Sequence, residues 1–138
     1  MKVNVPGRGR ADIHGVAVVG PVWTDPDMYR EACAYLQRTA DAGLDADAIE
    51  FDGIVFQPLR WRGRTNAAML RHMVRDLADE FPDGRPRFDG VCVLEGWITD
   101  GAAAFAVDVA RACGAVVMGL DEWARALEPA GGKQKGGE

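Results

Sequence analysis

Three side chains with usable chemistry follow the apolar run VCVL in the second half of the chain. Glu95 and Asp100 are carboxylates, and the ring of Trp97 has the size and polarity to stack on a base. A carboxylate directly after a buried strand faces a cleft, because an unpaired charge inside the core is very costly. We therefore expect Glu95 to contact a ligand. Trp97 either stacks on that ligand or packs at the start of a helix.

A Gly-Pro turn after the first apolar run is a second candidate site. Gly20, Pro21 and Trp23 lie where a strand ends and a helix begins, and the free amide groups of such a turn can receive an anion or a sugar. The turn is not a GxGxxG fingerprint, and we expect no cofactor. Trp23 is either a ligand contact or a structural plug.

Asp76 is the third candidate, on a helix expected over residues 66–81. At helical spacing it stands beside two methionines on the flank of the apolar stripe, so it must be paired or near solvent. The alternative is an ordinary flanking charge with Arg75 nearby. His72 could pair with Asp76, but no third ligand stands at a useful spacing, and we expect no metal site.

The elements that must position these residues alternate between strand and helix. We expect strands at 15–21, 53–58, 90–94 and 115–118, and helices at about 26–43, 66–81, 101–113 and 121–127. Parallel neighbours need a crossover, which is usually a helix. The alternation therefore predicts a three-layer α/β domain of Rossmann or flavodoxin type with a four- or five-stranded parallel sheet.

One domain accounts for most of the 138 residues. Residues 1–14 are polar and look like an N-terminal arm, residues 15–127 form the α/β domain, and residues 128–138 look like a flexible tail. Hydrophobic residues make up 48% and charged residues 27% of the chain, which is ordinary globular usage and excludes disorder for most of its length.

Charge and cysteine usage limit the partners and the compartment. The net charge of −5 offers no general attraction for a polyanion, so we expect no nucleic-acid partner. No apolar run is long enough for a membrane span, and we expect no membrane partner. The three cysteines have no CxxC spacing and lie in apolar patterns, which predicts buried free thiols and a cytoplasmic location.

The helix expected over residues 101–113 is apolar nearly all round, interrupted only by Asp108 among residues 102–110. A helix of this kind is buried on more than one side. We therefore expect it to pack against its own sheet and against a partner subunit. The predicted assembly is a homodimer or a higher homo-oligomer.

A series of short motifs follows the elements in order. They are Val19-Gly20-Pro21, Gln57-Pro58, Arg75-Asp76-Leu77, Gly96-Trp97, and finally Ala110 with Gly114. In order and spacing they resemble the nucleoside 2-deoxyribosyltransferase superfamily and the related deoxynucleotide N-hydrolases, especially small members often encoded by phages. The resemblance covers about three-quarters of the chain.

The resemblance implies a covalent mechanism whose central residue is missing. In that family a Glu attacks the anomeric carbon of the sugar and holds it as a glycosyl intermediate. The matching position holds Ala106, and Asp108 is turned by about 200° along the helix, so it is not a ready substitute. Nucleotide-cleaving relatives have a phosphate-contacting Ser where this chain has Asp100, which implies a nucleoside rather than a nucleotide.

The sequence thus predicts a nucleoside 2-deoxyribosyltransferase-like protein that binds a nucleoside or nucleotide, with its action on the N-glycosidic bond altered or lost. If it is an enzyme, Glu95 replaces the missing nucleophile and Asp100 acts as acid or base. Asp76 is the third catalytic candidate, and the expected ligand-binding residues are Gly20, Pro21, Trp23 and Trp97. The alternative is a non-enzymatic module of the same fold that binds a nucleotide-like ligand or a protein.

Overall fold

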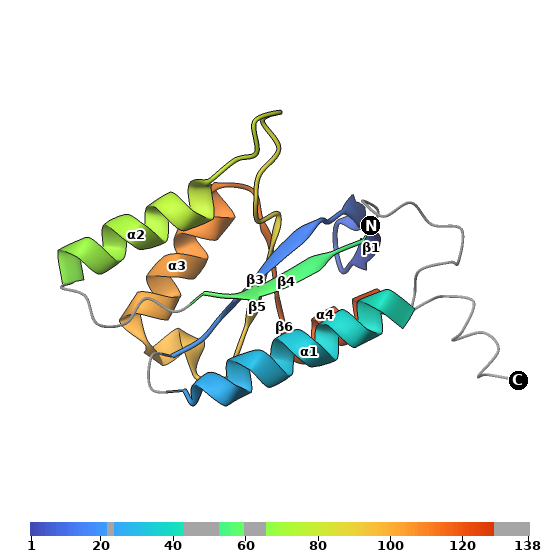
Figure 1. Cartoon of the computed structure of the whole chain (residues 1–138), viewed down its shortest axis with the longest axis horizontal. Coiled ribbons are helices and arrows are strands. Elements are labelled where there is room, and N and C mark those ends of the chain that lie inside the picture. The colour runs from blue at the N-terminus through green and yellow to red at the C-terminus, as the bar shows by residue number, and fades with distance from the viewer. Residues whose placement is uncertain (22–23, 43–52, 60–65, 129–138) are drawn as a thin grey trace, which may run out of the picture.

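The computed structural model describes residues 1–21, 24–42, 53–59 and 66–128. Its centre is a four-stranded, all-parallel sheet with strand order β4-β3-β5-β6 (Figure 1). The strands are β3 (Gly15–Val19), β4 (Val55–Pro58), β5 (Gly90–Val93) and β6 (Val116–Gly119). Every residue of β3 and β5 is buried, as their continuous apolar runs predict for central strands covered on both faces.

Two helices cover each face of the sheet (Figure 1). They are α1 (Pro26–Ala42) and α4 (Leu120–Leu127) on one face, and α2 (Asn66–Ala78) and α3 (Gly101–Ala112) on the other. The predicted three-layer α/β architecture is therefore confirmed. No helix in the described ranges is both long enough and apolar enough to cross a membrane.

Helix α1 begins as its sequence predicts. The Asp25 carboxylate accepts a hydrogen bond from the Asp27 backbone N–H at 2.9 Å, and Pro26 occupies the first helical position. Proline suits that position because its missing N–H would be unpaired there in any case. The buried face of the helix consists of Tyr29, Ala32, Leu36 and Ala40, at the spacing of an amphipathic helix.

Residues 1–14 form a folded hairpin rather than a lead-in arm. Strands β1 (Lys2–Val5) and β2 (Gly9–Asp12) pair in antiparallel register, and β1 contacts α4. Val3, Val5 and Ile13 are buried in the core on the α1 and α4 side of the sheet. The alternation of Val3 and Val5 with polar residues is a strand pattern, but it is too short to stand out in a polar segment.

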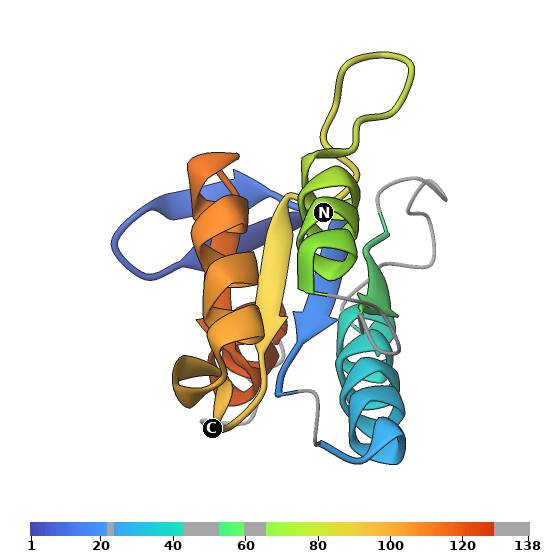
Figure 2. The ribbon, with the colours of Figure 1, turned by 90° about the vertical axis from the view of Figure 1, so that its left-hand side faces the viewer.

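Helix α2 is shorter than predicted, because it ends at Ala78 instead of continuing to Phe81. The Phe81 backbone N–H donates to the Arg85 carbonyl at 2.8 Å, which turns the chain back on itself. Phe81 remains 37% exposed, with the Arg85 and Arg87 guanidinium groups over its ring. The connection between α2 and β5 therefore projects from the body of the domain (Figure 2).

The cysteines are free, but they are not all buried. Cys92 in β5 is buried, Cys33 is half-buried, and Cys113 after α3 is exposed, which corrects the expectation of three buried thiols. Cys113 lies where the helix ends and the chain turns toward β6, so its place in an apolar pattern did not ensure burial. Burial raises the pKa of Cys92 to about 12 and that of Cys33 to about 11.

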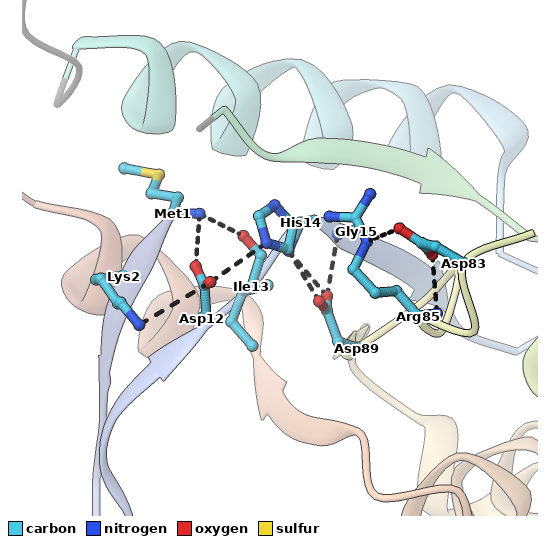
Figure 3. Close-up of polar contacts among 9 residues, drawn as sticks. All are labelled: Met1, Lys2, Asp12, Ile13, His14, Gly15, Asp83, Arg85 and Asp89. Carbon is cyan, nitrogen blue, oxygen red and sulfur yellow. Dashed lines mark hydrogen bonds and ion pairs between the residues drawn. The ribbon is translucent and has the colours of Figure 1, made fainter. Parts of the chain in front are cut away.

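A group of polar contacts ties the loops to the amino end of the sheet (Figure 3). The Asp89 carboxylate accepts hydrogen bonds from the backbone N–H groups of His14 and Gly15, each at 3.0 Å. The Asp12 carboxylate lies 3.1 Å from the Met1 amino group and 3.5 Å from His14 Nε2. These carboxylates fix the start of β3 next to the start of β5.

Candidate functional site

An open pocket of about 850 Å³ lies at the carboxyl ends of β5 and β6. Residues of α1, α3, α4 and the short 3-10 helix η2 (Trp97–Thr99) complete its walls. In open α/β sheets this end of the strands is where ligands bind. The apolar part of the lining includes Met28, Tyr35, Leu94, Trp97, Met118 and Leu120.

Two of the predicted site residues, Glu95 and Trp97, line this pocket. Between them Gly96 adopts φ of +88°, a left-handed conformation that a side chain would strain, and this turns the chain sharply after β5. Glu95 is exposed at the turn. The Trp97 ring lies under the Arg111 guanidinium, with 6.0 Å between the guanidinium carbon and the ring centroid.

The predicted Gly-Pro turn packs beside this turn without lining the pocket. A Cβ at Gly20 would lie 2.9 Å from the Leu94 Cβ, so the close packing of the two segments is sufficient to require a glycine here. Pro21 lies against Gly96, and its carbonyl accepts a hydrogen bond from the Tyr29 hydroxyl at 3.0 Å. Trp23, the third residue expected there, lies outside the described residues.

The two predicted aspartates are held away from the pocket lining. Asp100 is the N-cap of α3: it is 8% exposed, and its carboxylate accepts a hydrogen bond from the Ala102 N–H at 3.2 Å. Asp76 is half-exposed on α2, with its carboxylate 4.0 Å from Arg75 Nε. Neither aspartate lines the pocket described here. Their catalytic roles stay predictions, and the cap gives Asp100 a structural reason to be an aspartate.

Ala106, the position matched to the family nucleophile, faces the core. It is 1% exposed and belongs to the apolar cluster between the sheet, α2 and α3. Asp108, two residues further along α3, is exposed. The two side chains are about 200° apart around the helix axis, and accordingly one faces the core and the other faces solvent.

Helix α1 supplies pocket residues that sequence reasoning missed. Met28, Glu31 and Tyr35 lie on the flank of its buried stripe and line the pocket. Met28 is 57% exposed and Tyr35 is 43% exposed, which is unusual for residues of their size and apolar character. The sequence feature that could have indicated them is that Met28 and Tyr35, seven residues apart, lie beside the buried stripe of the helix rather than in it.

Charged groups in the pocket are mostly acidic. Among the residues that the structure describes, Glu31, Glu95, Asp121 and Glu122 line it, against the single guanidinium of Arg111. Glu122 caps α4, because its carboxylate accepts a hydrogen bond from the Gly119 N–H at 3.0 Å. Glu31 and Glu95 make no hydrogen bond or ion pair with any residue that the structure describes. Within those same residues, no group of three His, Cys, Asp or Glu side chains could hold a metal ion.

No protein-family model matches the chain, and no curated protein or solved structure matches it either. The site must therefore be interpreted from its own geometry. The resemblance to nucleoside 2-deoxyribosyltransferases remains a prediction.

Proposed function

We propose that this protein binds a nucleoside in the pocket at the carboxyl ends of β5 and β6. The observation behind the proposal is the combination of Trp97 with Glu95 on an apolar wall. An indole ring offers a face for a base, and a carboxylate at a strand end can accept hydrogen bonds from ribose hydroxyls. The volume of about 850 Å³ is within the range of small-molecule sites.

A nucleoside fits the charges of the pocket better than a nucleotide does. Four carboxylates and one guanidinium line it, so a phosphate would meet mainly charges of its own sign. The resemblance described from the sequence likewise implies, through Asp100, a nucleoside rather than a nucleotide. Binding, rather than covalent glycosyl transfer through residue 106, is the activity we propose.

Calorimetry with the four common deoxynucleosides and their 5′-monophosphates tests the proposal. We expect at least one nucleoside to bind, and its monophosphate to bind more weakly. Trp97→Ala should weaken binding by about tenfold, since base–aromatic stacking is worth roughly 1–3 kcal/mol. Ile98→Ala is the matched control, because Ile98 is the next residue and is 69% exposed without lining the pocket. Absence of nucleoside binding would refute the proposal.

Chromatography of the same mixtures tests for release of the base. We expect none through a covalent intermediate on Ala106, because an alanine cannot attack carbon. If turnover is observed, Glu95→Gln should abolish it, because Glu95 is the carboxylate that the turn after β5 exposes to the pocket. Asp108→Asn is the control, since Asp108 is exposed on α3 and does not line the pocket.

The outward face of α3 favours a second role, as a surface for self-association. Ile98 is 69% exposed and Phe105 is 36% exposed, and the partly buried Ala102 and Val109 lie at helical spacing with Phe105. We propose a homodimer through this face. We also propose a reducing, cytoplasmic compartment, because the three cysteines are free. Light scattering that gave the 14.9 kDa mass of one chain at micromolar concentration would exclude the dimer.

A further inference from the structure

Two of the four pocket carboxylates have a structural explanation, and two do not. Asp121 and Glu122 lie in the first turn of α4, where negative charge stabilises a helix, and Glu122 also caps it. Glu31 belongs to α1 and Glu95 to the turn after β5, so different elements bring them to one pocket. Neither pairs with a residue that the structure describes.

Among the described residues, four carboxylates line the pocket against the one guanidinium of Arg111, so the lining carries a net negative charge. Like charges repel one another, and the repulsion is stronger near a protein surface than in bulk water. A cation bound between the carboxylates would be attracted to each of them and would offset their mutual repulsion. The pocket is therefore better suited to a positively charged ligand than to a neutral one.

The lining points to an organic cation rather than a metal ion. Among the described residues no three potential metal ligands stand close enough together to hold an ion. The same pocket has a wall of large apolar side chains, which a hydrated ion would not use. A molecule with an apolar body and a charged amine would contact both the wall and the carboxylates.

Trp97 shows how the body of such a ligand could be held. The Arg111 guanidinium already lies over its ring at 6.0 Å, within the distance of a cation–π interaction. The ring of Tyr35, 43% exposed on α1, lines the same pocket. The site thus combines aromatic faces with carboxylates, and both attract cations.

We infer that the ligand of this pocket is an aromatic amine: a flat ring system with a protonated amino group that lies against Glu31 and Glu95. The inference rests on the proposed function and narrows it to nucleosides, or similar ring compounds, that bear an amine.

Binding of tryptamine and of tryptophol to the whole chain tests the inference, because the two differ only in an amine against a hydroxyl. We expect tryptamine to bind at least about tenfold more tightly at low salt, and this preference to shrink as salt screens the charges. Equal affinity, or no binding of either compound, would overturn the inference.

Variants connect the preference to the two carboxylates. In the double variant Glu31→Gln with Glu95→Gln, the affinity for tryptamine should fall to that for tryptophol. Asp108→Asn removes one exposed carboxylate outside the pocket and should leave the preference intact. Circular dichroism confirms that each variant is folded. A preference that survives in the double variant would refute the assignment to Glu31 and Glu95.

A second series separates this inference from the proposed function. Adenosine, its 5′-monophosphate and 5′-amino-5′-deoxyadenosine share one body with a neutral, an anionic and a cationic substituent. We expect the amine to bind tightest and the phosphate weakest. If adenosine and its amine bind equally, the nucleoside proposal stands and the charge inference fails. If no nucleoside binds but tryptamine does, the nucleoside proposal fails and the charge inference stands.

Discussion

Carboxylates lie at both ends of the central sheet, and their surroundings differ. At the amino end, the Asp89 carboxylate accepts hydrogen bonds at 3.0 Å from the backbone N–H groups of His14 and Gly15. The Asp79 carboxylate accepts a side-chain hydrogen bond from Arg87 Nε at 2.7 Å. At the carboxyl end Glu31 and Glu95 line a pocket and pair with none of the described residues. Asp89 ties the start of β3 to the start of β5, whereas we propose that Glu31 and Glu95 meet a ligand.

The comparison separates carboxylates that accept hydrogen bonds from the fold from carboxylates that pair with no described residue. A carboxylate that accepts several hydrogen bonds is stabilised by the fold and stabilises it in return. An exposed carboxylate without partners contributes little to stability. Substitutions at the two ends should therefore affect different properties, stability at one end and binding at the other.

The largest effect should come from placing a carboxylate at neither end but in the core. Ala106→Glu puts a charge into an apolar cluster where the residue is 1% exposed, and we expect a loss of about 3 kcal/mol or more in the free energy of unfolding. Ala104→Glu, on a partly exposed side of α3, should cost much less. Equal urea midpoints for the two variants would show that α3 does not bury position 106.

Asp89→Ala should give the next largest effect. It leaves the backbone N–H groups of His14 and Gly15 without their acceptor, which costs about 1–3 kcal/mol. Nucleoside affinity should not change, because the pocket lies at the other end of the sheet. A loss of binding without a loss of stability would contradict the division between the two ends.

The double variant Glu31→Gln with Glu95→Gln should show the opposite pattern. Its free energy of unfolding should stay within about 0.5 kcal/mol of the unmodified chain, since both side chains are exposed and no described residue pairs with them. Its preference for tryptamine should disappear. Chemical denaturation of the same samples used for binding measures both. A large destabilisation would assign these carboxylates to the fold instead.

The smallest effect concerns pH at the amino end. The hydrogen bond from Arg87 holds the pKa of Asp79 below its usual value, so this pair stabilises the fold above the ordinary aspartate pKa of about 4. The contribution is lost as the pH falls through the lowered pKa. We expect Arg87→Gln to lower the urea midpoint slightly at pH 7, and by less as the pH falls below the ordinary aspartate pKa. A difference that persists at low pH would show that Arg87 acts through packing on Phe81.

Local patterns were sufficient to predict much of the fold. Continuous apolar runs marked the buried strands β3 and β5, and Asp25 with Pro26 marked the start of α1. The position of Glu95 directly after an apolar run placed it at the carboxyl end of the sheet, where the pocket lies. Each of these features depends on residues within a few positions of one another, which is why the sequence alone reveals them.

Tertiary packing decided the rest. Met28, Tyr35 and Arg111 became pocket residues because α1 and α3 bring their flanks to the ends of β5 and β6, a result of how distant segments pack. Asp100 was used to cap α3 rather than to line this pocket. The sequence determined which segments of the α/β domain are strands and helices and where a strand-end carboxylate stands, but it did not reveal the hairpin of β1 and β2. Only the packing of those segments decided which side chains share a pocket, because that depends on contacts between residues far apart in the chain.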